Sequence, residues 1–544
     1  MKLHGSFSAL GVLGALGATM VFACDDGAIP EPAVAPPRVA VVETGARAIR
    51  REIFEIDGVV PPPNPATGAT TPATQNRLRV VRHRLDSDPP KPARAIFVLV
   101  PGFLAGAGSF DGLARALVRR STDTEAFEAW AIDRRSNLLE DTHGLDFAEV
   151  TGSARPALDY YFDDKVVAGK RFAGFVTGPE APWASEWGMA TTVGDLHKVV
   201  ELVPQADRKA RVVLVGHSMG ATMVEAFAAW AFDRPGHEEI AALALLDGVA
   251  RTEGAPASSV DRNRYEKGGT LGGFPAPGID AIRAGNTFVT IPLLGVEALA
   301  VAEMVAIDAA NAPTSPLGEN GPRDRLLTTA LGLSALPRLT NASAFGLAFD
   351  EGSAPLTFAA ARCGAPTGGP MVPYNGALGE KLVHPSDPAA TYTWSDGLDV
   401  GEPTRLADLA TAWFSGPGVN FPEWYFPQRL SLDAAVVGTL EIDDADWRSQ
   451  LYGLRAKHGR SIAVPIFGAA FRLVGTVSAF DNLRALVKTP PASFTTKAYP
   501  ELSHIDGLVG ADVPNGAAKV VYDDLVAFAL RSTSAGGVVV PARP

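Results

Sequence analysis

Apolar residues along this chain follow two patterns, which predict two kinds of β-strand. Residues 51–60 (REIFEIDGVV) and 76–85 (NRLRVVRHRL) alternate apolar with polar side chains, as half-buried antiparallel strands do. Residues 94–102 (RAIFVLVPG), 211–215 (RVVLV) and 240–248 (IAALALLDG) are almost continuously apolar, which is typical of strands covered on both faces. We therefore expect a sheet that begins with antiparallel strands and continues with buried ones.

Segments with helical periodicity separate the buried strands. Residues 109–120, 191–203 and 221–233 each carry apolar side chains on one helical face, and residues 127–133 have the composition of a further strand. Parallel neighbours cannot be joined by tight turns, so alternating strands and helices indicate crossover connections. The pattern predicts an α/β fold with a mostly parallel central sheet flanked by helices.

This alternation stops between residues 251 and 455, where the chain is rich in Gly, Pro and Ala. Strand character returns at 461–470 and 493–500, and an amphipathic helix follows. We expect a core formed by residues 45–250 and 456–535, with residues 251–455 inserted between its two parts as a cap or lid. Residues 536–544 are expected to be a flexible tail. Within the insertion, residues 291–310 are apolar enough to suggest a membrane span. Three internal carboxylates favour a buried or amphipathic helix there instead.

The first residues have the pattern of an export signal. A short basic start precedes an apolar stretch that ends in VFAC, which resembles a bacterial lipobox with Cys24 as the lipidated N-terminus. We expect residues 1–23 to be a signal peptide and residues 24–44, rich in Pro and Ala, to be a tether. The protein would then be lipid-anchored in the bacterial cell envelope, in the periplasm or on the outer surface. Ordinary cleavage after Ala23 would instead make it secreted.

Composition and charge narrow the range of ligands. The net charge is −12 and basic residues are not clustered, which argues against nucleic acid as a partner. The only cysteines are Cys24 and Cys363, so a lipidated Cys24 would leave no intrachain disulfide. The chain has no zinc-ligand spacing, phosphate loop or dinucleotide fingerprint, and the acidic residues 441–447 lack the pattern of a calcium loop. We expect no metal and no cofactor, and the sequence does not indicate an oligomeric state.

Ser218 lies in the motif Gly-His-Ser-Met-Gly, directly between a predicted buried strand and a predicted helix. In such a nucleophile elbow the turn is tight, so the positions two before and two after the serine must be small. Gly216 and Gly220 meet that requirement. The hydroxyl would stand at the start of a helix, whose positive end favours developing negative charge. The sequence predicts that Ser218 is a nucleophile.

A serine nucleophile requires a base, and His504 is the best placed of the nine histidines. It follows the last predicted strand and precedes the last helix, which puts it at the same sheet edge as the elbow. His217, beside the nucleophile, has no comparable position. His504 is therefore the predicted general base.

The histidine in turn requires an acid that orients its ring. Asp481 is the one carboxylate between residues 460 and 500, in the crossover before the histidine strand, and it is the preferred candidate. Asp247, at the end of residues 240–248, is the alternative. Asp506, two residues past His504, is expected to cap the last helix.

Two backbone amides should receive the oxyanion that forms during acyl transfer. One is the amide of Met219, directly after the nucleophile. The other should come from the glycine-rich loop after residues 94–100, with Phe103 as the expected donor and Leu104 as the alternative.

The order strand–PGFL–helix, strand–GHSMG–helix, aspartate and histidine resembles the α/β-hydrolase superfamily of esterases and lipases. The resemblance covers residues 45–250 and 455–535. Two features depart from it: Pro101-Gly102 stands where many relatives have His-Gly, and Asp481 lacks the common Gly-x-x-Asp context. The resemblance implies an α/β-hydrolase fold with a cap and hydrolysis of carboxylic esters through an acyl-enzyme.

The insertion should cover Ser218, because it leaves the sheet at the same edge as the elbow. Its aromatic clusters at 391–394, 412–414 and 421–426 favour a small-molecule or lipid-like ester with a hydrophobic acyl or alcohol group, although these side chains could also form the core of the cap itself. The same residues would serve an amidase, peptidase or lactonase. A surface binding protein of this fold is the non-catalytic alternative.

Overall fold

The computed structural model describes residues 38–45, 47–250, 260–271, 274–290, 295–318, 338–376 and 381–541. The predicted signal peptide and Cys24 lie outside these ranges. No helix within them is both long and apolar enough to cross a membrane.

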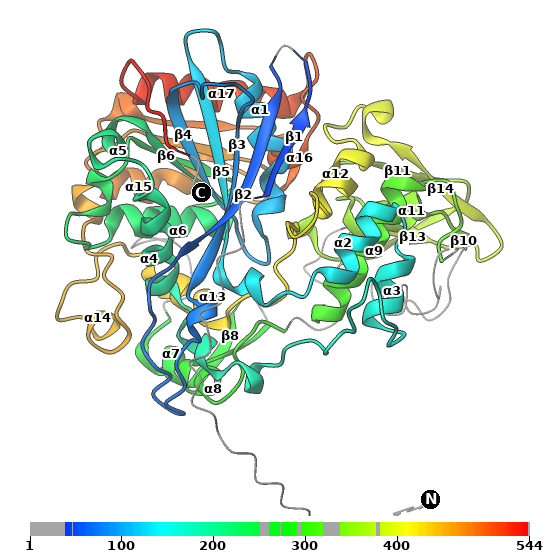
Figure 1. The fold of residues 1–544 in the computed structure, drawn as a ribbon, viewed down its shortest axis with the longest axis horizontal. Helices are drawn as coiled ribbons and strands as arrows, with labels where there is room; N and C mark the ends of the chain where they lie inside the picture. Colours follow the sequence, from blue (N-terminus) through cyan, green and yellow to red (C-terminus); the bar gives the residue numbers. More distant parts are fainter. Residues whose placement is uncertain are drawn as a thin grey trace, which may run out of the picture. The chain divides into compact units, whose positions relative to one another are not determined.

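The centre of the molecule is a nine-stranded sheet with the order β1-β2-β3-β5-β4-β6-β7-β15-β16 (Figure 1). In chain order its strands are β1 (Arg38–Glu43), β2 (Ile49–Asp57), β3 (Arg77–Leu85), β4 (Ala93–Val100), β5 (Ala126–Asp133), β6 (Val212–His217), β7 (Ala242–Leu246), β15 (Ile466–Ala470) and β16 (Phe494–Ala498). The pairs from β1 to β5 are antiparallel, and those from β5 through β4 to β16 are parallel. The strand pattern in the sequence predicted this division.

Helices cover both faces of the sheet, and the apolar strands reflect this. In β4, Ile96 and Val98 pack into one core cluster while Phe97 and Leu99 pack into another, and all four are fully buried. The first face carries α4 (Met189–Val200), α6 (Met219–Ala229) and α15 (Asp481–Leu486), with α5 (Gln205–Arg211) nearby; the second carries α1 (Asp111–Arg119) and α17 (Ala517–Ser532) (Figure 1).

The segment 251–455 forms two groups of elements. One packs near α4 and α6 and consists of α7 (Arg262–Lys267), β8 (Gly268–Leu271), β9 (Phe274–Pro277), α8 (Ile279–Arg283), α13 (Gln428–Val437) and α14 (Trp447–Tyr452). The other consists of α9 (Val296–Asn311), β10 (Arg338–Leu339), α11 (Asn341–Phe349), β11 (Gly364–Thr367), β12 (Met371–Asn375), β13 (Lys381–Pro385), β14 (Thr391–Asp396) and α12 (Leu406–Trp413). The helix expected within residues 291–310 is α9; residues 291–294 lie outside the described ranges.

Two helices from the first part of the core join this second group. After β5 the chain forms α2 (His143–Thr151) and α3 (Arg155–Tyr161), and α2 packs against α9 (Figure 1). The sequence pattern did not distinguish these helices from the core. The body beside the sheet is thus built from two stretches of the chain, on either side of β6 and β7.

Both ends of the described chain are more ordered than expected. Residues 38–43, which were assigned to the tether, form the strand β1 and pair with β2 in the antiparallel sense. In the predicted tail, Val538 exchanges two backbone hydrogen bonds with Ala93, of 2.7 and 3.0 Å. Sheet pairing therefore includes residues 38–43 and Val538, and the predicted tether and tail are corrected at these residues; residues 24–37 and 542–544 lie outside the described ranges.

Candidate active site

Ser218 stands at the turn between β6 and α6, in a strained backbone conformation. Its φ is 55° and its ψ is −126°, an unusual combination for a residue other than glycine. A side chain at Gly216 would collide with the backbone of Gly220, and one at Gly220 would collide with the carbonyl of Val100. The sharp turn therefore needs both glycines, and the serine at its apex is only partly buried.

The loop after β4, residues 101–105, lies against this serine. A Cβ atom placed on Gly102 would come within 2.8 Å of the Ser218 Cβ and 3.3 Å of its Oγ. The next amide in the loop belongs to Phe103, and Met219 is the first residue of α6, whose N–H precedes the first intrahelical hydrogen bond. Both amides predicted as oxyanion donors are therefore on segments adjacent to the hydroxyl. Leu104, the alternative donor, has a φ of 54°.

His504 follows β16 and is held by Asp247. Its Nδ1 lies 2.7 Å from Asp247 Oδ2, and both side chains are buried. Since Nδ1 is occupied by the carboxylate, Nε2 is the ring nitrogen left to act on a hydroxyl. No hydrogen bond joins the His504 ring to Ser218 within the described part of the chain, although both residues line the same pocket. Catalytic hydrogen bonds often tighten only when substrate binds.

Asp247 occupies a site built for a carboxylate. The turn after β15 donates three backbone amides to it: Phe471 at 2.8 Å, Val474 at 3.0 Å and Leu473 at 3.3 Å. Burial alone would raise the pKa of Asp247, but the hydrogen bond and charge of His504, together with the Val474 amide, hold the pKa below its ordinary value. The carboxylate is therefore kept ionised beside the imidazole.

Asp481, the acid favoured in the sequence analysis, is not near His504, and that preference is corrected. It is the first residue of α15, its side chain is 60% exposed, and it pairs with Arg484 at 3.4 Å. The crossover after β15 carries it away from the strand ends and onto the face of the sheet. Asp247 takes its place because β7 neighbours β15, so that the end of β7 lies under the histidine loop.

His217 takes part in the site, a role that was not predicted from the sequence. Its ring centroid lies 4.4 Å from that of His504, and its Nε2 lies 2.8 Å from the His504 backbone carbonyl. Burial and the neighbouring His504 lower the pKa of His217 to about 3. It is therefore a neutral donor that holds the backbone of the base. Its position beside the nucleophile was the available signal.

Asp506 ties the histidine loop to the insertion. Its carboxylate accepts hydrogen bonds from Ser503 N at 2.7 Å, from Arg362 N at 3.0 Å and from the Thr404 hydroxyl at 2.6 Å. It was expected to cap the last helix, α17. It begins the short helix α16 (Asp506–Val509) instead, and two of its partners belong to residues 251–455.

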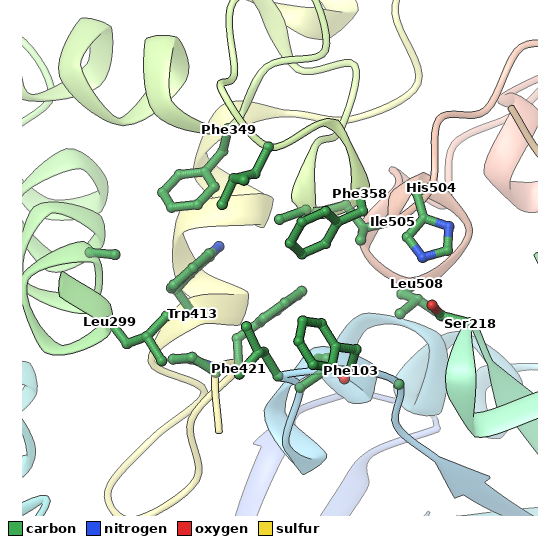
Figure 2. Close-up of a pocket in the computed structure, with 18 of the residues that line it drawn as sticks. Phe103, Ser218, Leu299, Phe349, Phe358, Trp413, Phe421, His504, Ile505 and Leu508 are labelled. Carbon is green, nitrogen blue, oxygen red and sulfur yellow. The ribbon is translucent and has the colours of Figure 1, made fainter. Parts of the chain in front are cut away.

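The pocket in front of Ser218 is almost entirely apolar. Figure 2 shows Ser218 and His504 at one end, with Leu299, Phe349 and Trp413 at the other. The walls come from the loop after β4, the α16 region and the insertion; among them are Phe103, Leu104, Ala298, Leu299, Ala302, Phe349, Leu356, Phe358, Trp413, Phe421, Pro422, Ile505 and Leu508.

The aromatic clusters of the insertion divide between the pocket and the core. Trp413 and Phe421 line the pocket and stack on each other with centroids 5.1 Å apart. Tyr392, Trp424 and Tyr425 are buried in the surrounding core and do not line this pocket. Among the described residues, no three His, Cys, Asp or Glu side chains gather as metal ligands.

No protein-family model matches the chain, and no curated protein matches its sequence. Solved structures with a similar backbone include a protein from Sulfolobus solfataricus provisionally designated a lipase, 12% identical, covering 90% of this chain and 99% of its own, with a TM-score of 0.42. A peroxisomal alpha-beta-hydrolase from Saccharomyces cerevisiae is 9% identical and covers 92% of this chain and 93% of its own, with a TM-score of 0.40. An epoxide hydrolase from Vigna radiata is 14% identical and covers 83% of this chain and 93% of its own, with a TM-score of 0.34.

The strand order of the sheet itself identifies the fold. Antiparallel β2 and β3 lead into parallel strands, the serine turn follows β6, and the histidine loop follows the last strand. The chain has the α/β-hydrolase fold, with β1 added at one edge and a large insertion between β7 and β15.

Proposed function

We propose that the protein is a serine hydrolase of carboxylic esters, with Ser218, His504 and Asp247 as its catalytic triad. The observation that carries this proposal is the hydrogen bond from His504 to the buried Asp247, because His504 lines the same pocket as the strained Ser218. The acid, the base and the nucleophile follow three separate strands, and a catalytic triad explains why these three side chains lie close together.

Each group has a distinct task in the proposed reaction. The Ser218 Oγ attacks the acyl carbon while His504 Nε2 takes its proton, and the amides of Phe103 and Met219 receive the oxyanion. His504 then protonates the leaving alcohol, and an acyl-enzyme remains. Water, deprotonated by His504, releases the acid and regenerates the serine. Asp247 keeps the ring oriented and stabilises its positive charge in both steps.

The pocket supports a hydrophobic substrate. Its far end is formed by Leu299, Phe349 and Trp413, and no charged side chain lines it within the described residues. Burial of an alkyl chain there would contribute about 0.8 kcal/mol per methylene group. A charged acyl group would lose its hydration without finding a partner.

The direct test is hydrolysis of p-nitrophenyl esters with acyl chains of two to sixteen carbons. Ser218→Ala should abolish turnover and labelling by a fluorophosphonate probe, whereas the exposed Ser478→Ala should change neither. The value of kcat/KM should rise as the alkyl chain lengthens, until the pocket is full. Equal rates for wild type and Ser218→Ala would refute the proposal. Faster cleavage of matched amides or lactones would keep the triad but change the bond.

We also propose that the protein is exported and carries lipid on Cys24. The support is the sequence pattern alone, and the triad does not depend on it. Labelling with a fatty-acid analogue in a bacterial host should occur in wild type and be lost in Cys24→Ala. A labelled Cys24→Ala protein, or an unlabelled wild type, would contradict lipidation.

A further inference from the structure

The loop that carries the proposed oxyanion donor is held from behind by one buried arginine. Arg134, directly after β5, donates hydrogen bonds to the carbonyl oxygens of Pro101 at 2.9 Å, Gly102 at 3.0 Å and Ala105 at 2.7 Å. Its side chain is 5% exposed and is absent from the residues that line the pocket in the described structure. The arginine therefore contacts the loop and not the substrate.

The contact with Gly102 sets the direction of the neighbouring amide. In a trans peptide, the carbonyl oxygen of one residue and the N–H of the next point in opposite directions. Since the Gly102 oxygen points toward Arg134, the Phe103 N–H points away from it. Gly102 itself lies against Ser218, and Gly102, Phe103 and Ser218 all line the pocket, whereas Arg134 does not line it in the described structure.

The insertion completes this arrangement. Glu423 pairs with Arg134 through the Nε–Oε2 contact of 2.8 Å and a second guanidinium contact, and its backbone N–H donates to the carbonyl of Leu104 at 2.9 Å. The ring of Phe426 lies 5.0 Å from the guanidinium carbon, and Ser136 donates to the Glu423 carboxylate. Glu423 is fully buried.

Stability does not readily explain such a pair. Removing two charges from water costs several kcal/mol per ion, and apolar residues of similar size often serve a core equally well. A guanidinium is nevertheless suited to bind several carbonyls at once, because its donors form a rigid planar array. The placement of this pair behind residues 101–105 matches that use.

We infer that Arg134 and Glu423 are positioning residues that aim the Phe103 amide at the oxyanion, so that the insertion is part of the catalytic apparatus as well as a cover. This inference rests on the proposed serine-hydrolase function. Arg134 supplies hydrogen bonds to three carbonyls of the loop, and Glu423 neutralises the guanidinium and binds the carbonyl of Leu104.

The test compares Arg134→Met, Arg134→Lys and Glu423→Gln with wild type. Arg135→Met is the matched control, because Arg135 is equally buried but pairs with Asp195 and does not contact the loop. Turnover is normalised to active sites titrated with a fluorophosphonate, so that misfolded protein is not counted. A trifluoromethyl ketone with the acyl group of the substrate serves as a second probe, since its hemiketal oxygen occupies the oxyanion position.

We expect Arg134→Met to lower kcat per titrated site by about 10²- to 10³-fold, with KM changed less than about threefold. Inhibition by the trifluoromethyl ketone should weaken in proportion to kcat/KM. Arg134→Lys and Glu423→Gln should show smaller losses of the same kind, and Arg135→Met should retain wild-type kcat per site.

Wild-type kcat per site and ketone affinity in Arg134→Lys and Glu423→Gln would overturn the inference, even if Arg134→Met does not fold. A wild-type protein without esterase activity or probe labelling would instead refute the proposed function, and the inference with it.

Discussion

At the scale of single residues, hydrogen bonds from its surroundings hold the carboxylate of Asp247 in place. Three amides from the turn after β15 and the ring of His504 all converge on its two oxygens. Such hydrogen bonds favour the charged form of the acid, which is the form that can stabilise an imidazolium.

Asp247→Asn should therefore lower kcat by about 10³- to 10⁴-fold, because the amide leaves the ring in the wrong tautomer and without a counter-charge. Asp481→Asn should leave kcat unchanged, since the Asp481 side chain is 60% exposed and pairs with Arg484 at the surface. The measurement is kcat per fluorophosphonate-titrated site, with the melting temperature as a check on folding. A larger loss in Asp481→Asn would return the role to that residue.

At the scale of an element, α9 both lines the pocket and carries a buried carboxyl group. Ala298 and Leu299 line the pocket, whereas Glu303, farther along the helix, accepts a hydrogen bond of 2.7 Å from the Trp424 indole. Burial, and then the neighbouring Glu140, raise the pKa of Glu303 well above its ordinary value. The folded protein therefore retains a proton that the unfolded chain releases near pH 4.5.

A folded-state pKa above the unfolded one means that stability falls as the pH rises between the two values. Glu303→Gln keeps the acceptor for Trp424 and removes the titration. We expect melting temperatures close to wild type at pH 5 and higher by about 1–3 °C at pH 9. Glu297→Gln, an exposed change on the same helix, should show no such difference. A gain for Glu303→Gln that is equal at both pH values would contradict the account.

The elements of the sheet could be predicted from the sequence because each is recorded in a local pattern. A buried strand is a run of apolar residues, and its period of two places alternate side chains in the two cores, as Phe97 and Val98 show. The helices α2 and α3 could not be assigned in this way. Their place in the body beside α9 depends on contacts with a segment that follows more than a hundred residues later in the chain.

At the scale of the whole molecule, the C-terminal segment forms hydrogen bonds with the sheet and with α5. Besides the pairing of Val538 with Ala93, the carbonyl of Val540 accepts a hydrogen bond of 2.8 Å from the buried Arg82. Arg211 donates to the carbonyls of Ser534, Ala535 and Gly536. Residues 534–540 thus provide backbone acceptors for two buried arginines, Arg82 of β3 and Arg211 of α5.

Deletion of residues 536–544 should lower the free energy of unfolding by about 3 kcal/mol or more, because Val538 and Val540 are buried and Arg82 loses an acceptor. Urea denaturation followed by fluorescence measures this loss. Val539→Ala is the control, since Val539 is 42% exposed and should change stability little. An unaltered midpoint for the truncated protein would show that this segment does not contribute to the core.

The sequence by itself determined the parts of the site that depend on neighbours in the chain. The turn at Ser218 follows from Gly216 and Gly220, and the position of His504 follows from the strand before it and the helix after it. Parallel strands also end at one edge of a sheet, so these two residues were expected to lie at the same edge. Each of these conclusions rests on steric or periodic rules that act over a few residues.

Only the tertiary structure decided which acid meets His504 and what stands behind the oxyanion loop. Both depend on the order of strands in the sheet and on the path of the insertion, which no local pattern records. Because β7 neighbours β15, Asp247 lies under the histidine loop while Asp481 is carried to the surface. Because the insertion returns beside β5, Glu423 reaches Arg134, which lies 289 positions before it in the chain.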